Sequence, residues 1–329
     1  MRAVEKRSEN RSLELLKRAW RDYSVLLVFI AIIGICAVAA PRFLRMDNLL
    51  NILRNTSTVG AIALGMTFVI IAGGIDLSSG PVLAVSGAVL ILLQRMVNAD
   101  GSPAVPLAFA VLACLAVATS FGFLNGIIIT KAKLPPFIVT LAVGIMARSL
   151  VMYFMRGATV MGNNIPQFTS IGNGSVFSIP IPFILVVAVA IVFHIFLTRT
   201  KFGTYVFAVG GNENAARYSG IKVDRIRIAT YMIVGLCTGM AATIEMSRMA
   251  AVAAATSGSQ YEFEAITAVI VGGTSLNGGK GRLIGSIVGF IILGIVNNMM
   301  FMLNISPYLS GAVKGAVILF AVLMQRRER

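Results

Sequence analysis

Long apolar runs, separated by short stretches of glycine, proline and charged residues, make up most of the 329-residue chain. A helix that crosses a bilayer needs about 20 mainly apolar residues. We place such runs at residues 23–40, 51–72, 76–97, 104–130, 136–155, 181–198, 226–250, 260–273, 282–302 and 307–324. The eighth run is too short to cross comfortably, so we expect a broken or re-entrant helix there. The pattern predicts an all-α, polytopic membrane protein with about ten transmembrane helices.

The composition agrees with this pattern. Hydrophobic residues make up 57% of the chain and charged residues 12%, and the mean hydropathy is +0.87, which is too apolar for a soluble domain. The net charge of +15 would in a soluble protein indicate nucleic-acid binding. Here, with the N-terminus inside, the cytoplasmic segments hold 20 of the 28 lysines and arginines. The positive-inside rule therefore predicts cytoplasmic N- and C-termini and no nucleic-acid partner.

The chain divides into three parts. In residues 1–22, Leu13, Leu16 and Trp20 recur at helical spacing among cations, which predicts a cytoplasmic amphipathic segment on the membrane surface. Residues 23–325 form a single transmembrane domain with a cytoplasmic loop at about 199–227, and residues 326–329 a cytoplasmic tail. The first apolar run ends in CAVAAP, like a signal-peptide cleavage site. We expect an uncleaved span, because the run is long for a signal peptide and many spans follow.

Few residues could carry catalytic or metal chemistry. Cys36, Cys114 and Cys237 lie inside apolar runs without a Cys-x-x-Cys spacing, and the single histidine, His194, lies near the end of another run. A metal site or an integral membrane enzyme would need such residues to cluster. We therefore expect packing roles for them, and neither a metal site nor catalysis in this chain.

The sequence also lacks a nucleotide-binding motif. Its Gly-rich stretch GGTSLNGGKGR has Thr274 and Gly281 where a P-loop needs Gly and then Ser or Thr. Ion-coupled transporters use ionisable groups midway along spans. The acidic residues of the spans lie instead near predicted helix ends, at Asp76, Glu245, Glu262 and Glu264. Transport by this protein would thus need an energy source in another subunit.

Five polar residues within spans or at their ends are candidates for lining a translocation path: Asp76, Ser78, Asn125, Asn297 and Asn298. The amides can hydrogen-bond to hydroxyl groups of a solute, or join one helix to another. Asp76 and Ser78 can instead cap the helix that follows them. The sequence leaves these alternatives open.

Two Gly-rich stretches have related patterns. AGGIDLSSGPVLAVSGAVL, from Ala72, and VGGTSLNGGKGRLIGSIVGFIIL, from Val271, each have Gly-Gly, Leu three residues later and Gly three residues after that. Each then continues into an apolar helix. This pattern indicates an internal repeat with broken helices, an arrangement common in transporters.

The most polar long stretch in the interior of the chain is GGNENAARYSGIKVDRIR, residues 210–227. Gly210 and Gly211 break the chain before a short helix-prone run at residues 212–218, and Gly220 ends that run. Glu213 and Arg217 are four residues apart, so they can pair on one face of the helix. Composition alone describes a solvated connector, and the topology places it in the cytoplasm.

Together with this loop, four further motifs carry a family resemblance. They are GMTFVIIAGGIDLSSG, FLNGIIITKAKLPPFIVTLA, YEFEAITAVIVGGTSLNGGKGR and GIVNNMMFMLNISPY. In this order they closely resemble the monosaccharide permeases of bacterial ABC importers, and in particular the ribose type. The resemblance extends from about residue 20 to the C-terminus.

The resemblance implies a homodimer in the lipid of the bacterial inner membrane. It would dock on a cytoplasmic ATPase, which uses ATP and Mg, and receive ribose or a related simple sugar from an extracytoplasmic sugar-binding protein. No cofactor is expected in this chain. The resemblance also implies a coupling helix that seats in the ATPase, at Asn212, Glu213, Asn214, Ala215, Ala216, Arg217 and Gly220. The main alternative is an ion-coupled secondary transporter of a small polar solute.

Overall fold

The computed structural model describes residues 30, 33–40, 42–98, 103–163, 165–306, 309, 311, 312, 315, 316 and 319. The predicted N-terminal segment of residues 1–22 and the tail of residues 326–329 lie outside the described residues. So do parts of the first and tenth apolar runs.

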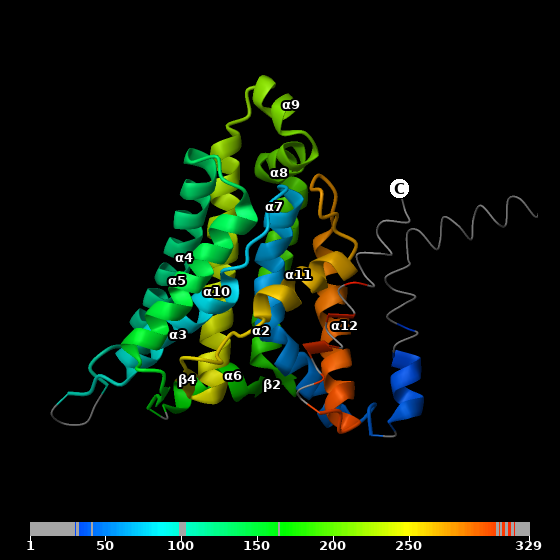
Figure 1. Ribbon diagram of the computed structural model, residues 1–329. Helices are drawn as coiled ribbons and strands as arrows, with labels where there is room; N and C mark the ends of the chain where they lie inside the picture. The colour runs from blue at the N-terminus through cyan, green and yellow to red at the C-terminus, as the bar shows by residue number, and fades with distance from the viewer. Residues whose placement is uncertain are drawn as a thin grey trace, which may run out of the picture.

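The described chain is mainly helical (Figure 1). The long helices are α2 (Met46–Ile71), α4 (Leu107–Lys131), α5 (Pro136–Phe154), α7 (Ile181–Arg199), α10 (Val223–Met249) and α12 (Leu283–Met302). The shorter helices are α3 (Ser79–Gln94), α6 (Pro166–Asn173), α8 (Lys201–Gly211), α9 (Glu213–Tyr218) and α11 (Tyr261–Val271). Two small antiparallel pairs join β1 (Thr159–Met161) to β4 (Ala251–Ala253) and β2 (Ser175–Val176) to β3 (Ile179–Pro180). Helix α9 projects at one end of the bundle, and α6, β2 and β4 lie at the other (Figure 1).

Six helices in the described part of the chain are long and apolar enough to cross a membrane: α2, α4, α5, α7, α10 and α12. The predicted all-α, polytopic membrane fold is therefore confirmed. The count of about ten spans and the cytoplasmic position of the two termini stay predictions.

The third and eighth predicted runs form helices shorter than a span. Helix α2 ends at Ile71, and Gly73, two residues later, has a left-handed φ of 79°. The chain stays non-helical up to Ser78, so α3 begins only at Ser79 and has 16 residues. Helix α11 has only 11 residues, as expected for the eighth run. Both helices thus start inside the bundle, where neighbouring segments must satisfy the free backbone groups.

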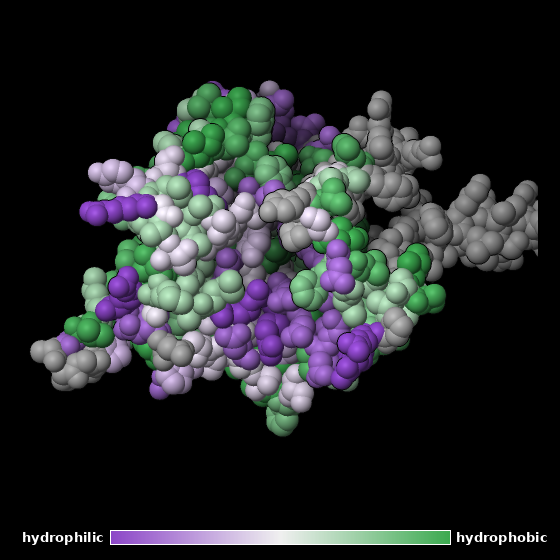
Figure 2. All heavy atoms as spheres, turned by 60° about the horizontal axis from the view of Figure 1, so that its bottom comes forward, coloured by the Kyte–Doolittle hydropathy of each residue, from purple (hydrophilic) through white to green (hydrophobic). Residues whose placement is uncertain are grey.

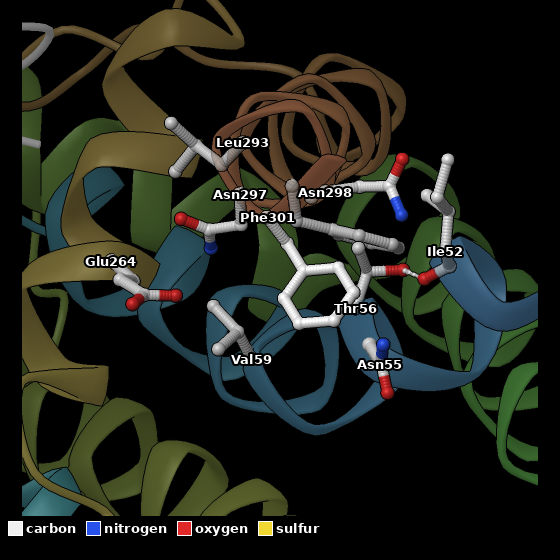
Figure 3. A pocket seen from close by; sticks show the side chains of 11 residues that line it. Ile52, Asn55, Thr56, Val59, Glu264, Leu293, Asn297, Asn298 and Phe301 are labelled. Atoms are coloured by element: carbon white, nitrogen blue, oxygen red, sulfur yellow. Dashed lines mark hydrogen bonds between the residues drawn. The ribbon is translucent and has the colours of Figure 1, made fainter. Parts of the chain in front are cut away.

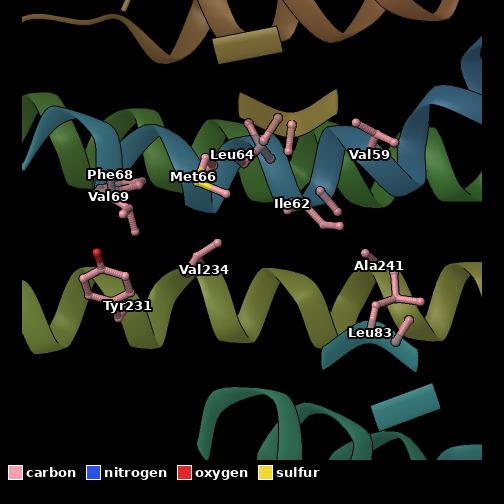
Figure 4. Close-up of a cluster of buried hydrophobic side chains, with 14 of the residues drawn as sticks. Val59, Ile62, Leu64, Met66, Phe68, Val69, Leu83, Tyr231, Val234 and Ala241 are labelled. Carbon is pink, nitrogen blue, oxygen red and sulfur yellow. The ribbon is translucent and has the colours of Figure 1, made fainter. Parts of the chain in front are cut away.

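Helices α2 and α10 form the centre of the bundle. Every residue of α2 from Thr56 to Ile71 is buried, whereas α4, α5 and α7 expose much of their apolar surface. Figure 4 shows α2 side chains such as Val69 facing α10, where Tyr231 and Val234 lie. Apolar surface on the outer helices suits contact with lipid, so the protein's own core is concentrated on α2 and α10.

Close approach of the helices depends on small residues. A Cβ atom at Gly122 of α4 would overlap the Tyr231 carbonyl of α10, and one at Gly235 of α10 would lie 2.6 Å from the Ala118 carbonyl of α4. Likewise, a Cβ at Gly289 of α12 would overlap a carbonyl of α11. These glycines let backbones touch where any side chain would separate them.

We predict that Gly122→Leu lowers the melting temperature of the detergent-purified protein, since overpacking of this kind costs about 1–3 kcal/mol. Ala116→Leu is the matched control, because Ala116 is on the same helix and exposed. Thermal unfolding followed by circular dichroism or light scattering would measure both. Equal melting temperatures would contradict the importance of the α4–α10 contact.

Candidate functional site

The ends of α2 and α11 have the same cap geometry. After α2, the amides of Gly73 and Gly74 donate to the carbonyls of Ile70 and Val69. After α11, the corresponding bonds run from Gly273 and Thr274 to Ile270 and Val269, each residue 200 positions later. Both caps have the two bonds of a Schellman motif. The geometry therefore pairs Gly73 with Gly273, whereas matching the Gly-Gly pairs in the sequence pairs Gly73 with Gly272.

Three of the five predicted path residues come together in the break between α2 and α3. One carboxylate oxygen of Asp76 accepts hydrogen bonds from the Ser78 amide at 2.7 Å and the Ser78 hydroxyl at 2.6 Å. Asn125 of α4 donates to the same hydroxyl at 2.8 Å. All three residues are almost fully buried. Asp76 and Ser78 thus hold the turn that precedes α3, although neither side chain caps a free N–H group of the helix itself, and Asn125 ties this turn to α4.

Two further side chains hold this non-helical stretch. Thr140 of α5 accepts from the Leu77 amide at 3.1 Å, and the Tyr231 hydroxyl of α10 donates to the Ile75 carbonyl at 3.2 Å. The backbone groups of this stretch are not paired within a helix or a sheet, so these side chains supply the hydrogen bonds that secondary structure would otherwise provide. The break is a fixed part of the core.

The start of α11 lies against the start of α3. A Cβ atom at Gly80 of α3 would overlap both the Glu262 carboxylate and the Gly258 carbonyl. Arg148 of α5 donates to the carbonyls of Ala254 and Ser257 at 2.9 Å each, which holds the chain that leads into α11. Glu262 is buried at this meeting of two helix N-termini, where the helix dipoles favour negative charge.

A pocket of about 290 Å³ lies between α2, α11 and α12 (Figure 3). Eleven residues line it: Ile52, Asn55, Thr56, Val59, Glu264, Phe290, Leu293, Gly294, Asn297, Asn298 and Phe301. The lining is towards the start of α2 and the end of α12, at the end of the bundle opposite α9 (Figure 1). Figure 2 shows hydrophilic residues gathered across the centre of that face.

The two adjacent path candidates on α12 have different surroundings. The Asn297 amide reaches into the pocket on the side of Glu264 (Figure 3). The Asn298 amide exchanges two hydrogen bonds with Asn48 of α2, at 2.9 and 3.1 Å. Asn298 therefore joins α12 to α2 through its amide, and Asn297 is the one directed at open space.

Glu264 was not among the predicted path residues. It lies two positions after Glu262 on α11, so the helical turn directs the two side chains to different sides, Glu262 towards α3 and Glu264 towards the pocket. The sequence shows that this short helix is acidic. It does not show which of the two acids faces a cavity, because that depends on how α11 packs.

At the opposite end of the molecule, α9 forms the predicted short helix between α8 and α10. The Asn212 side chain caps it by accepting from the Ala215 amide at 2.9 Å, and Gly220, with a φ of 81°, ends the turn. Ala216 faces inward and is buried, whereas Asn214, Ala215 and Tyr218 are exposed. Tyr218 is 91% exposed, an unusual position for a large aromatic ring.

The predicted Glu213–Arg217 pair forms, at 3.1 Å, and belongs to a larger network. The second carboxylate oxygen of Glu213 binds Arg227 of α10 at 2.7 Å, and Arg217 also pairs with Asp224 of α10 at 3.4 Å. Its hydrogen bond to Glu213 raises the pKa of Arg217. Glu213 and Arg217 thus fasten α9 to the start of α10, which the i, i+4 spacing alone does not reveal.

Glycines from three segments meet beside α9, and we call them the glycine junction: Gly73, Gly210, Gly278 and Gly279. The Gly279 amide donates to the Ile71 carbonyl at the end of α2, at 2.8 Å. A Cβ at Gly210 would overlap that carbonyl and lie 2.7 Å from the Gly279 nitrogen. A Cβ at Gly278 would lie 3.0 Å from the Gly73 Cα. The end of α8 is therefore packed, backbone on backbone, against the end of α2 and the loop that leads into α12.

Residues 48–322 match the family described as "Branched-chain amino acid transport system / permease component". Among curated proteins, the ribose import permease RbsC of Bacillus subtilis is 41% identical, over 92% of this chain and 91% of its own. RbsC of Escherichia coli is 38% identical, over 95% and 96%. The L-arabinose permease AraH of E. coli is 34% identical, over 95% and 92%. No solved structure matches this chain.

These matches cover nearly the whole chain and agree with its apolar helices. They confirm the resemblance carried by the loop and the four motifs. The chain belongs to the permease family of ABC importers that includes the ribose permeases, and it is a multi-pass protein of the inner membrane.

Proposed function

We propose that this chain is the permease subunit of an ABC importer for ribose or a related simple sugar, driven by a separate ATPase. The observation that carries the proposal is the arrangement of α9, an exposed helix fixed by ion pairs to α10 and through α8 to the glycine junction. Relatives named for ribose, allose and arabinose support a sugar as cargo. The expected partners are a cytoplasmic ATPase, an extracytoplasmic sugar-binding protein and a second copy of this chain.

In this proposal α9 receives the movement of the ATPase. The ion pairs from Glu213 to Arg217 and Arg227 keep α9 at a fixed angle to α10, so a force on the exposed face of α9 moves α8 and α10 with it. Because Gly210 touches the α2 carbonyl of Ile71 and the loop before α12, that movement reaches two helices that line the pocket. Closure of the ATPase would then alter the pocket at the far end of α2.

The coupling assignment predicts that Glu213→Ala with Arg217→Ala abolishes co-purification of the ATPase and transport, while the permease still inserts in the membrane. Removal of both residues releases α9 from Arg227 and Asp224. The matched control is Arg45→Ala with Asp47→Ala, an exposed pair at the start of α2. Normal assembly of the α9 variant would exclude the coupling role.

A second prediction concerns the glycine junction. Gly210→Ala forces a methyl group against the Ile71 carbonyl, whereas Gly211→Ala meets nothing within 4 Å. We expect Gly210→Ala to reduce sugar uptake at least about tenfold, the effect of roughly 1.4 kcal/mol, with the ATPase still bound. Gly211→Ala should keep uptake close to that of the unchanged protein. Equal uptake by the two variants would show that the junction does not carry the movement.

The competing class, an ion-coupled secondary transporter, makes an opposite prediction for the isolated chain. In liposomes without the ATPase, we expect no uptake of labelled D-ribose under a proton or sodium gradient. Uptake should begin only when the ATPase, ATP, Mg and the sugar-binding protein are supplied. Gradient-driven uptake by the chain alone would overturn the proposed function.

A further inference from the structure

The pocket between α2, α11 and α12 has a size and lining suited to a small solute. Ligand pockets in proteins commonly have volumes of about 300–1,000 Å³, so its volume of about 290 Å³ is at the lower end of that range. A monosaccharide is of this class, and a disaccharide would need more room. Three helices supply the lining, so the space is defined by how they pack rather than by one loop.

Polar groups in the pocket suit a ligand that carries hydroxyls. The Glu264 carboxylate accepts hydrogen bonds, and the Asn297 amide both accepts and donates them. They come from facing helices, α11 and α12, and lie on the same side of the pocket (Figure 3). Val59, Phe290 and Phe301 supply apolar surface beside them, which can cover the C–H face of a sugar ring.

The charge of the lining discriminates between the two kinds of cargo suggested by the family's description and by the relatives' names. An amino acid is a zwitterion: its ammonium group can pair with an acidic side chain, but its carboxylate needs a lysine, an arginine or free backbone N–H groups. The described residues that line the pocket include no lysine or arginine, and the charged residue among them is Glu264. An anionic group would therefore meet like charge here, whereas a neutral sugar would not.

We infer that this pocket is a monosaccharide subsite, in which Glu264 and Asn297 bind hydroxyl groups of the passing sugar. The inference rests on the proposed function and adds to it the residues that touch the cargo. It also separates Asn297, which binds sugar, from Asn298, whose amide joins α12 to Asn48. Asp76, Ser78 and Asn125 lie outside the lining of this pocket.

Cysteine substitutions at two asparagines, one in the pocket lining and one outside it, test the subsite in the assembled importer with its ATPase and sugar-binding protein. Cys36, Cys114 and Cys237 are buried, so a polar thiol reagent reports on an introduced cysteine. We expect Asn297→Cys to react, and D-ribose at ten times its half-saturating concentration to slow the reaction about tenfold. Asn51→Cys is the matched control, because Asn51 is exposed and lies outside the lining of the pocket, so D-ribose should leave its labelling rate unchanged. Protection of Asn297→Cys by L-leucine instead of D-ribose would overturn the assignment to sugar.

Transport supplies a second measurement. Glu264→Gln and Asn297→Leu should each lower D-ribose uptake about tenfold or more, as expected for loss of a hydrogen bond to a charged or buried polar group. ATP hydrolysis stimulated by the binding protein should remain, which a misfolded permease could not support. Unchanged uptake in both variants would overturn the subsite while leaving the importer function intact. Loss of stimulated ATP hydrolysis in the unchanged protein would instead contradict the proposed function.

Discussion

The positions of three segments depend on one hydrogen bond, from the Gly279 amide to the Ile71 carbonyl. It joins the last turn of α2 to the loop before α12, and Gly210 covers it so closely that no side chain fits between. Contacts between backbones have no flexible atoms to absorb a displacement. The position of α8, and with it α9, is thereby fixed relative to α2 and α12.

The mechanical consequence follows from the burial of α2. A helix packed on every side from Thr56 to Ile71 cannot bend into solvent or lipid, so a shift at its Ile71 end is passed along its length. The pocket-lining residues Ile52 and Asn55 lie in the half of α2 away from Ile71, and Val59 lies at its middle. The α9 surface and the pocket are thus opposite ends of one rigid element, an arrangement that suits transmission between distant sites.

The sequence predicts those features that depend on local pattern. Apolar run length located the long helices, and glycine placement located the short helix α9 and its Glu213–Arg217 pair. Contacts between segments that are distant in the chain could not be predicted from the sequence. Arg227 as a second partner of Glu213, and Gly210 against Ile71, join residues whose spacing has no helical or strand period. The orientation of Glu264 also depends on packing, since period alone does not say which face of a short helix meets a cavity.

Adjacent residues illustrate the same limit at finer scale. Asn297 and Asn298 have identical chemistry, yet about 100° of helical rotation directs one amide into the pocket and the other to Asn48. The sequence identifies both asparagines as candidates for the translocation path. Only the packing of the neighbouring helix shows which of the two faces the pocket.

Helix α11 has a consequence for how the protein is made. Its 11 residues are about half of what a segment needs to enter the bilayer independently, and the chain before it depends on Arg148 to bind the Ala254 and Ser257 carbonyls. This region can therefore leave water only after α5 and α3 are already in place to receive it. Biogenesis is therefore ordered, with α5 and α3 inserted before α11 packs against them.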